Sequence, residues 1–300
     1  MVIDAHVHVS RSEHEHPWVL EFMQDQFEGD LIAMIDRVLT PDAIRPFLQE
    51  HDIDWAVALA EVCPITTGVA TNEFVAKLCA QANALPDPSA GPRGRLIPFA
   101  SINPFVVNDL GAELERMVTE LGFRGFKVYP VYQHHYVNDT RMYPLYAKAQ
   151  ELRVPMLVHT GSSAFKGARI KYGDPLHLDD VAIDFPDLMI LMAHSGRPFW
   201  YSQAFWMARR HENVYLEISG LPGRKLLEYF PDLEKVADKV VYGSDWPGNP
   251  YLRRNIEAIR RLPLRDETKA KILGGTAARL LGLDPTPAQT ASLVDSKEGA

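Results

Sequence analysis

Cysteine is scarce in this sequence, and long hydrophobic runs are missing. Cys63 and Cys79 are the only cysteines among the 300 residues. Two cysteines are too few for a disulfide framework or a thiolate zinc cluster, and this favours a reducing compartment. No apolar run approaches a length of about 18 residues, and no basic segment with an apolar core precedes the first strand. We therefore expect a cytoplasmic protein that does not span a membrane.

Positive charge is also in short supply. The chain carries 31 lysines and arginines against 39 aspartates and glutamates, a formal net charge of −8. The basic residues are scattered, so neither a nucleic acid nor an acidic membrane surface is expected as a partner. A small-molecule substrate fits this composition better. The sequence is compatible with a homo-oligomer but does not specify one.

Apolar, β-branched runs are plentiful, and they alternate with helical patterns along the chain. This order is typical of a parallel sheet built from βα units. Eight runs predict a closed (β/α)8 TIM barrel, with residues 1–284 forming a single domain and 285–300 a flexible C-terminal tail. The predicted strands are the opening residues 1–10 and the runs 54–61, 96–103, 123–129, 154–160, 188–195, 214–219 and 239–245.

The segment 11–39 is longer than an ordinary βα loop. Leu31, Met34, Ile35 and Val38 recur in it at helical spacing. It follows directly after the first strand, so we interpret it as a lid-like insertion that covers the pocket.

The first strand ends in His6-Val7-His8. Side chains two residues apart in a strand share a face, so both imidazoles are able to bind one ion, while Ile3, Ala5 and the valines that follow are expected on the other face. Such a pair suits zinc or a neighbouring first-row metal. Two solvated histidines near a chain end are the alternative.

Three later predicted strands also end in residues that bind metals. The runs before His159, His194 and Asp245 are apolar, and each ends at the named residue or just before it. In (β/α)8 enzymes the catalytic groups lie at the carboxyl ends of the strands, where the eight βα loops meet. The sequence therefore predicts that these residues converge with the histidine pair.

A fifth strand carries Lys127 among apolar residues. An unpaired buried ammonium is costly, so Lys127 needs a partner. The partner is a carboxylate such as Glu61 or Asp245, a substrate anion, or carbon dioxide, which adds to the amine to form a carbamate able to bridge two cations.

The loops after these strands hold cations and aromatic rings, a mixture that suits a small carboxylated substrate, with aromatic acids and lactones as the candidates. Arg197 follows His194 by three residues and is the preferred carboxylate clamp, ahead of Arg169. The candidate substrate-binding residues are Arg197, Arg169, Tyr129, Tyr132, His134 and Trp246.

The ordered set of candidate ligands resembles the amidohydrolase superfamily over residues 1 to about 283. The phrases around the ligands are similar to its amidohydrolase-related branch of hydrolases, lactonases and aromatic-acid decarboxylases. They are Gly-Phe-Arg-Gly-Phe-Lys-Val-Tyr-Pro (122–130), Leu-Val-His-Thr-Gly (157–161), Ala-His-Ser-Gly (193–196) and Gly-Ser-Asp-Trp-Pro (243–247).

The resemblance implies a divalent metal, with zinc expected. One ion is favoured, and two ions bridged by a carbamylated Lys127 are the alternative. The implied metal ligands are His6, His8, His159, Asp245, Lys127 and His194.

Hydrolysis is the favoured reaction. A metal-bound water loses its proton to Asp245 and attacks a carbonyl polarised by the metal or by His194, so that Asp245, His194 and Lys127 are the catalytic candidates. The alternative is a metal-dependent, non-oxidative decarboxylase of an aromatic acid. Decarboxylases of this branch often begin with Glu-x-His, and the His-x-His of this chain therefore favours hydrolysis. A metal-dependent phosphodiesterase barrel is a third candidate. It ranks low, because the chain has no basic stripe that would bind a phosphate backbone.

Overall fold

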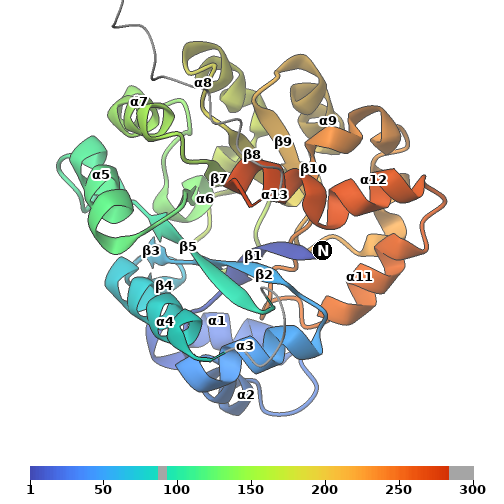
Figure 1. Cartoon of the computed structure of the whole chain (residues 1–300). Coiled ribbons are helices and arrows are strands. Elements are labelled where there is room, and N and C mark those ends of the chain that lie inside the picture. Colours follow the sequence, from blue (N-terminus) through green and yellow to red (C-terminus); the bar gives the residue numbers. More distant parts are fainter. Residues whose placement is uncertain (87–92, 284–300) are drawn as a thin grey trace, which may run out of the picture.

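A computed structural model describes residues 1–86 and 93–283 of the chain (Figure 1). The predicted tail 285–300 lies outside the described residues. Eight parallel strands form one sheet in the order β1-β2-β5-β6-β7-β8-β9-β10. Their bounds are Ile3–His8 (β1), Trp55–Leu59 (β2), Arg95–Ser101 (β5), Phe126–Val128 (β6), Met156–His159 (β7), Ile190–Ala193 (β8), Val214–Glu217 (β9) and Val240–Val241 (β10).

Hydrogen bonds between β1 and the chain after β10 close the sheet into a barrel. The amide of Ala5 donates to the carbonyl of Tyr242 at 3.0 Å, and the amide of His8 donates to the carbonyl of Trp246 at 2.8 Å. The amide of Asp245 returns a hydrogen bond to the carbonyl of His6 at 3.0 Å. The predicted (β/α)8 barrel is thereby confirmed, and its closure brings Asp245 beside the first strand.

Helices surround the strands as an outer ring, and α13 packs against the end of the barrel (Figure 1). Apolar residues of the strands divide between a large cluster shared with the helices and a smaller cluster inside the barrel. The helices are α1 Pro17–Gln24, α2 Leu31–Val38, α3 Pro41–Glu50, α4 Asn72–Ala84, α5 Leu110–Leu121, α6 Pro130–Gln133, α7 Tyr143–Leu152, α8 Leu178–Asp184, α9 Tyr201–Arg210, α10 Leu226–Tyr229, α11 Leu252–Arg260, α12 Asp266–Ala270 and α13 Thr276–Leu281.

The side chains of β1 do not alternate between the two faces as expected, because the strand contains a register shift. Its pairing with β2 is irregular between Asp4 and Val7. Ile3 and Ala5 belong to the inner cluster, whereas Val7 belongs to the outer one. The expectation that all these apolar residues share a face was wrong, because strict alternation fails at a bulge. The bulge places the side chains of His6 and His8 on the inner side.

The insertion after β1 is built from a 3-10 turn, Ser12–His14, followed by α1 and α2. It rests on a hairpin formed by β3 (Glu61–Cys63) and β4 (Gly68–Ala70), which the sequence did not predict. The amide of His16 donates to the carbonyl of Thr67 at 2.8 Å, and the indole of Trp18 donates to the carbonyl of Thr66 at 2.9 Å. The insertion and the hairpin therefore cover the barrel opening together.

Within residues 1–86 and 93–283, no helix has both the length and the apolar character needed to cross a membrane.

Candidate active site

His6, His8 and Asp245 form a compact triangle of potential metal ligands. Nε2 of His6 lies 3.2 Å from Nε2 of His8, and each of these nitrogens lies 3.5 Å from Oδ1 of Asp245. A tetrahedral zinc ion with bonds of about 2.0 to 2.1 Å holds its ligand atoms about 3.3 to 3.4 Å apart. The spacing of the three donor atoms therefore fits a first-row divalent metal.

Buried carboxylates orient both histidines from behind. Oε2 of Glu217, at the end of β9, lies 3.2 Å from Nδ1 of His6. Oε2 of Glu61, at the start of β3, lies 3.0 Å from Nδ1 of His8. A carboxylate that accepts the Nδ1 proton turns the Nε2 lone pair toward the metal. Two histidine–carboxylate pairs at one centre are typical of a metal site, as is the spacing of the donor atoms.

The pKa values of the three residues show how charge is distributed at this centre. Burial, with Lys127 nearby, holds the pKa of His6 well below its usual value. Burial also acts to lower the pKa of His8, but hydrogen bonds to Asp245 and Glu61 outweigh it and raise that pKa to about 9. Burial acts to raise the pKa of Asp245, but His194, His8 and other neighbours hold it well below the usual range. The carboxylates of Asp245 and Glu61 therefore favour positive charge at this centre, as a site for a metal cation requires.

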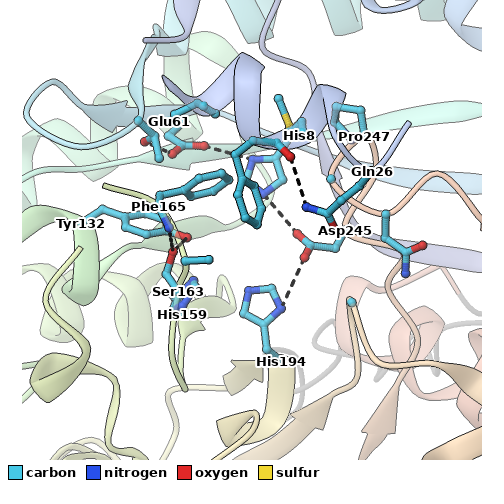
Figure 2. Close-up of a pocket in the computed structure, with 18 of the residues that line it drawn as sticks. His8, Gln26, Glu61, Tyr132, His159, Ser163, Phe165, His194, Asp245 and Pro247 are labelled. Carbon is cyan, nitrogen blue, oxygen red and sulfur yellow. Dashed lines mark hydrogen bonds and ion pairs between the residues drawn. The ribbon is translucent and has the colours of Figure 1, made fainter. Parts of the chain in front are cut away.

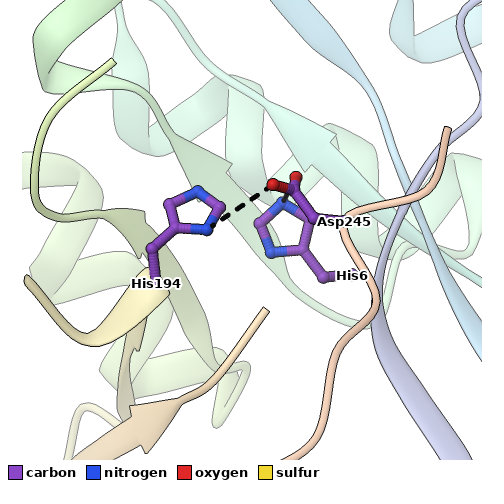
Figure 3. A group of neighbouring side chains, drawn as sticks. All are labelled: His6, His194 and Asp245. Atoms are coloured by element: carbon purple, nitrogen blue, oxygen red, sulfur yellow. Dashed lines mark ion pairs between the residues drawn. The ribbon is translucent and has the colours of Figure 1, made fainter. Parts of the chain in front are cut away.

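His194 reaches the other oxygen of the same carboxylate (Figure 3). Its Nδ1 lies 3.8 Å from Oδ2 of Asp245, and donor atoms of His6, His194 and Asp245 all lie within 4.8 Å of one another. His194, Ser195 and Asp245 have φ angles of 64°, 47° and 69°. Left-handed backbone at non-glycine residues is costly and often marks functional sites. These strained turns aim both side chains into the barrel opening.

Lys127 and His159 complete the group of predicted ligands. Nζ of Lys127 lies 3.3 Å from Nε2 of His6, and burial lowers its pKa to about 8. Among the described residues, no carboxylate oxygen lies within 4.0 Å of this nitrogen, so a direct salt bridge to Glu61 or Asp245, one of the three alternatives for its partner, is not formed. The ring of His159 lies 4.6 Å from that of His194, centre to centre, and its Nε2 lies 3.4 Å from the carbonyl of Ser162.

Two glycines leave room for the charged groups of the site. A Cβ atom on Gly220 would lie 1.7 Å from Nη1 of Arg197. A Cβ atom on Gly243 would lie 2.0 Å from Oε1 of Glu217. Any other residue at either position would displace these side chains, so glycine is required by close approach.

These residues open into a cavity of about 680 Å³ at the carboxyl ends of the strands (Figure 2). Tyr132 and Phe165 lie across the cavity from Asp245 in this view. Helix α1 of the insertion contributes further apolar side chains, and Phe22 contacts Phe165 with ring centres 5.3 Å apart. The cavity therefore combines an aromatic wall with charged groups at its base. Its apolar lining from α1 consists of Val19, Phe22 and Met23.

The structure divides the predicted substrate-binding residues into two groups. Arg197, Tyr129 and Tyr132 line the cavity. Three others lie outside its lining: Arg169 is exposed, His134 contacts the carbonyl of Gly167 at 2.9 Å, and Trp246 is buried against Phe47.

Sequence reasoning missed several polar residues of the site. Glu217 and Ser219 are completely buried on β9 and just after it, and they were not predicted as site residues. Glu15 of the insertion lines the cavity, and burial together with Glu61 raises its pKa to about 8. The nearby hydroxyl of Ser10 acts in the opposite direction and lowers the pKa of Glu15. This buried hydroxyl forms no hydrogen bond of normal geometry with the described residues. Alternation along β9, where Tyr215 faces inward, was the signal that would have revealed Glu217 and Ser219.

Comparison with known proteins agrees with this arrangement. A model of the amidohydrolase family matches residues 3–283. Gamma-resorcylate decarboxylase of Rhodococcus jostii (strain RHA1) is 24% identical over 294 residues, covering 81% of this chain and 88% of that protein. A 2-keto-4-carboxy-3-hexenedioate hydratase of Sphingobium sp. (strain NBRC 103272 / SYK-6) is 33% identical over 100 residues, but the match spans only 28% of this chain and 29% of the hydratase.

A solved structure shares the fold. It is a dihydroxybenzoic acid decarboxylase of Polaromonas sp. JS666 with bound manganese and the inhibitor 2-nitroresorcinol, and it superposes with a TM-score of 0.66 over 94% of this chain and 96% of that one. At 18% identity this likeness concerns the fold alone. Together, the match along nearly the whole chain, the barrel and the histidine–aspartate centre lead to one conclusion: the protein belongs to the amidohydrolase family.

Proposed function

We propose that the protein is a metal-dependent decarboxylase that removes the carboxyl group of a small aromatic acid without a redox step. The observation that carries the proposal is the make-up of the cavity, which Arg197, His8 and Asp245 line together with aromatic side chains that include Phe165. The match to gamma-resorcylate decarboxylase along most of both chains supports the same class of reaction. This choice reverses the order that the sequence favoured, in which His-x-His placed hydrolysis first.

Arg197 is the proposed binding group for the substrate carboxylate. Its side chain is 29% exposed and lines the cavity, and its Nη2 lies 3.1 Å from Oδ2 of Asp245. The planar guanidinium has further donors for a carboxylate beyond this one contact. An aromatic ring attached to that carboxylate would pack against Tyr132 and Phe165. A carboxylated aromatic substrate therefore matches both parts of the cavity.

The reaction requires one proton transfer at carbon. Carbon dioxide leaves with cleavage of the bond between the ring and the carboxyl group, and the electron pair stays on the ring carbon. A proton from solvent then takes the place of the carboxyl group, and Asp245 and His194 are the cavity side chains proposed to pass it to the ring carbon. A divalent ion held by His6, His8 and Asp245 would supply a Lewis acid for substrate oxygens.

A single divalent ion is proposed. The His6, His8 and Asp245 donor atoms form one tight triangle, and Nζ of Lys127 lies directly against His6. Two ions bridged by a carbamylated Lys127, with His159 as a further ligand, are the alternative. Zinc stays a prediction, and manganese is the metal bound to the Polaromonas decarboxylase.

Release of carbon dioxide tests the proposal directly. The metal-loaded protein is incubated with hydroxybenzoic acids labelled with ¹³C in the carboxyl group, and in parallel with lactones and an unsaturated dicarboxylic acid. We expect labelled carbon dioxide from at least one aromatic acid, and none after chelation of the metal. Hydrolysis of a lactone, or addition of water to the unsaturated acid, without any release of carbon dioxide would overturn the proposal.

A further inference from the structure

The hydroxyl of Ser219 joins three groups of the site. Ser219 is completely buried just after β9. Its Oγ lies 2.9 Å from Nδ1 of His6, 2.9 Å from Nδ1 of His194 and 2.7 Å from Oε2 of Glu217. A serine hydroxyl has one proton to donate and two lone pairs that accept. Three partners therefore use its full hydrogen-bonding capacity.

The proton assignment follows from the partners. Burial raises the pKa of Glu217 to about 8, and the hydrogen bond from Ser219 opposes this rise. In its carboxylate form Glu217 only accepts, so Ser219 donates its single proton to it. The two lone pairs of Oγ then accept, and both imidazoles must donate from Nδ1. A neutral imidazole carries one proton, so Nε2 of His6 and Nε2 of His194 are left with a lone pair.

Independent contacts lead to the same assignment at each ring. The backbone carbonyl of Ser219 lies 3.2 Å from Nδ1 of His194 and only accepts hydrogen bonds. At His6, Oε2 of Glu217 lies 3.2 Å from Nδ1, and Nζ of Lys127, whose ammonium form only donates, lies 3.3 Å from Nε2. At each ring, the contact with Ser219 Oγ and a second, separate contact therefore favour the tautomer protonated at Nδ1.

We propose that Ser219 is a positioning residue that holds His6 and His194 in the tautomer protonated at Nδ1, so that both rings present an Nε2 lone pair to the site. The lone pair of His6 is then ready to bind the metal. The lone pair of His194 lets it accept the proton that it is proposed to pass to the ring carbon, whereas sequence reasoning assigned it as a group that polarises a substrate oxygen. This consequence for His194 rests on the proposed function, whereas the two tautomers do not.

NMR of the full-length protein labelled with ¹⁵N-histidine tests the tautomers without any substrate. Long-range proton–nitrogen correlation spectra separate protonated from unprotonated ring nitrogens, and the His6→Gln and His194→Gln variants assign the two rings. In the metal-free wild-type protein at pH 8 we expect Nδ1 protonated and Nε2 unprotonated in both rings. An Nε2-protonated tautomer at either ring would overturn the proposal, even if every Ser219 variant failed to fold.

Variants then separate positioning from simple packing. Ser219→Ala is expected to give mixed tautomers and to lower metal affinity by about 10- to 100-fold, a loss typical of removing an outer partner of a metal ligand. Ser219→Thr, which keeps the hydroxyl, is expected to restore both readouts. Ser101→Ala is the matched control, because Ser101 is buried on β5 and bonds the amide of Val62 instead of a histidine. Unchanged tautomers and metal affinity in Ser219→Ala would contradict the inference, and failure to release carbon dioxide would affect only the proposed function.

Discussion

Nη2 of Arg197 lies 3.1 Å from Oδ2 of Asp245 and joins the turn after β8 to the segment after β10. The opposite oxygen of the same carboxylate faces His6 and His8. Asp245 therefore connects the group proposed to bind the substrate with the donors proposed to bind the metal. Substitutions of Arg197 and of Asp245 should therefore have different effects, the first on substrate binding and the second on turnover.

Arg197→Met should weaken substrate binding. A hydrogen bond to a charged group contributes about 1.5 to 3 kcal/mol, so we expect KM to rise by about 10- to 100-fold with a smaller fall in kcat. Steady-state kinetics on the best aromatic acid measures both constants. Arg169→Met is the control, since Arg169 is exposed and lies outside the cavity lining. An unchanged KM in Arg197→Met would reject the clamp.

Asp245→Asn should abolish turnover while much of the metal is retained. The amide keeps an oxygen for the metal but cannot carry a proton, so we expect kcat to fall by about 10² to 10⁴. Carbon dioxide release and elemental analysis are measured on the same preparation. Asp179→Asn, which alters a surface carboxylate of α8 that pairs with Arg210 and His211, serves as the control. Activity near the wild-type level would remove Asp245 from the mechanism.

Glu217→Gln and Glu61→Gln should each weaken metal binding without changing a proposed ligand. Each substitution replaces the carboxylate that orients His6 or His8, and we expect affinity to fall by about 10- to 100-fold. Competition with a chelator measures this loss. Glu113→Gln removes only the surface pair with Arg116 and should leave affinity unchanged. Equal affinities in all three variants would show that the buried carboxylates do not orient the ligands.

Protein purified without added metal should contain about one equivalent of a divalent ion. Removing it should lower the melting temperature, because a ligand at 100 times its Kd stabilises the folded state by about 2.7 kcal/mol. Elemental analysis, calorimetry and intact-protein mass spectrometry together test the single-ion proposal. Two equivalents, combined with a carbon dioxide adduct on Lys127, would replace it with the bridged two-metal site.

Acid should remove a stabilising contact at the surface. The hydrogen bond from His211 and the neighbouring Arg210 lower the pKa of Asp179, with Oδ1 lying 2.7 Å from Nε2 of His211. A lowered pKa means that the contribution is complete above the unfolded value of about 3.9 and is lost as pH falls through the folded value. Asp179→Asn should therefore lower the melting temperature at pH 6, with a difference that shrinks toward pH 3. A difference that stays constant with pH would contradict this assignment.

The inward alternation of strand residues explains which site groups could be predicted. In β2, Val57 and Leu59 face the interior of the barrel, and Glu61 continues that row. In β9, Tyr215 faces inward and Glu217 continues it. The same periodicity that indicates a strand therefore also indicates the buried carboxylates. His159 and His194 were easier to recognise, because a histidine at the end of an apolar run is itself a sign of a functional site.

The pattern of apolar runs and strand-end residues was sufficient to predict a (β/α)8 barrel, a covering insertion and convergence of the candidate ligands at one end of the barrel. Local periodicity determines these features, since each strand and helix depends mainly on its own sequence.

Only the tertiary structure decided which groups touch. The bulge between Asp4 and Val7 turns the histidine pair inward, and the contact of Ser219 Oγ with His6 joins residues 213 positions apart along the chain. It also placed Trp246 and Arg169 outside the cavity and Glu15 inside it. Such contacts depend on barrel closure and on the path of long loops, which no local pattern specifies.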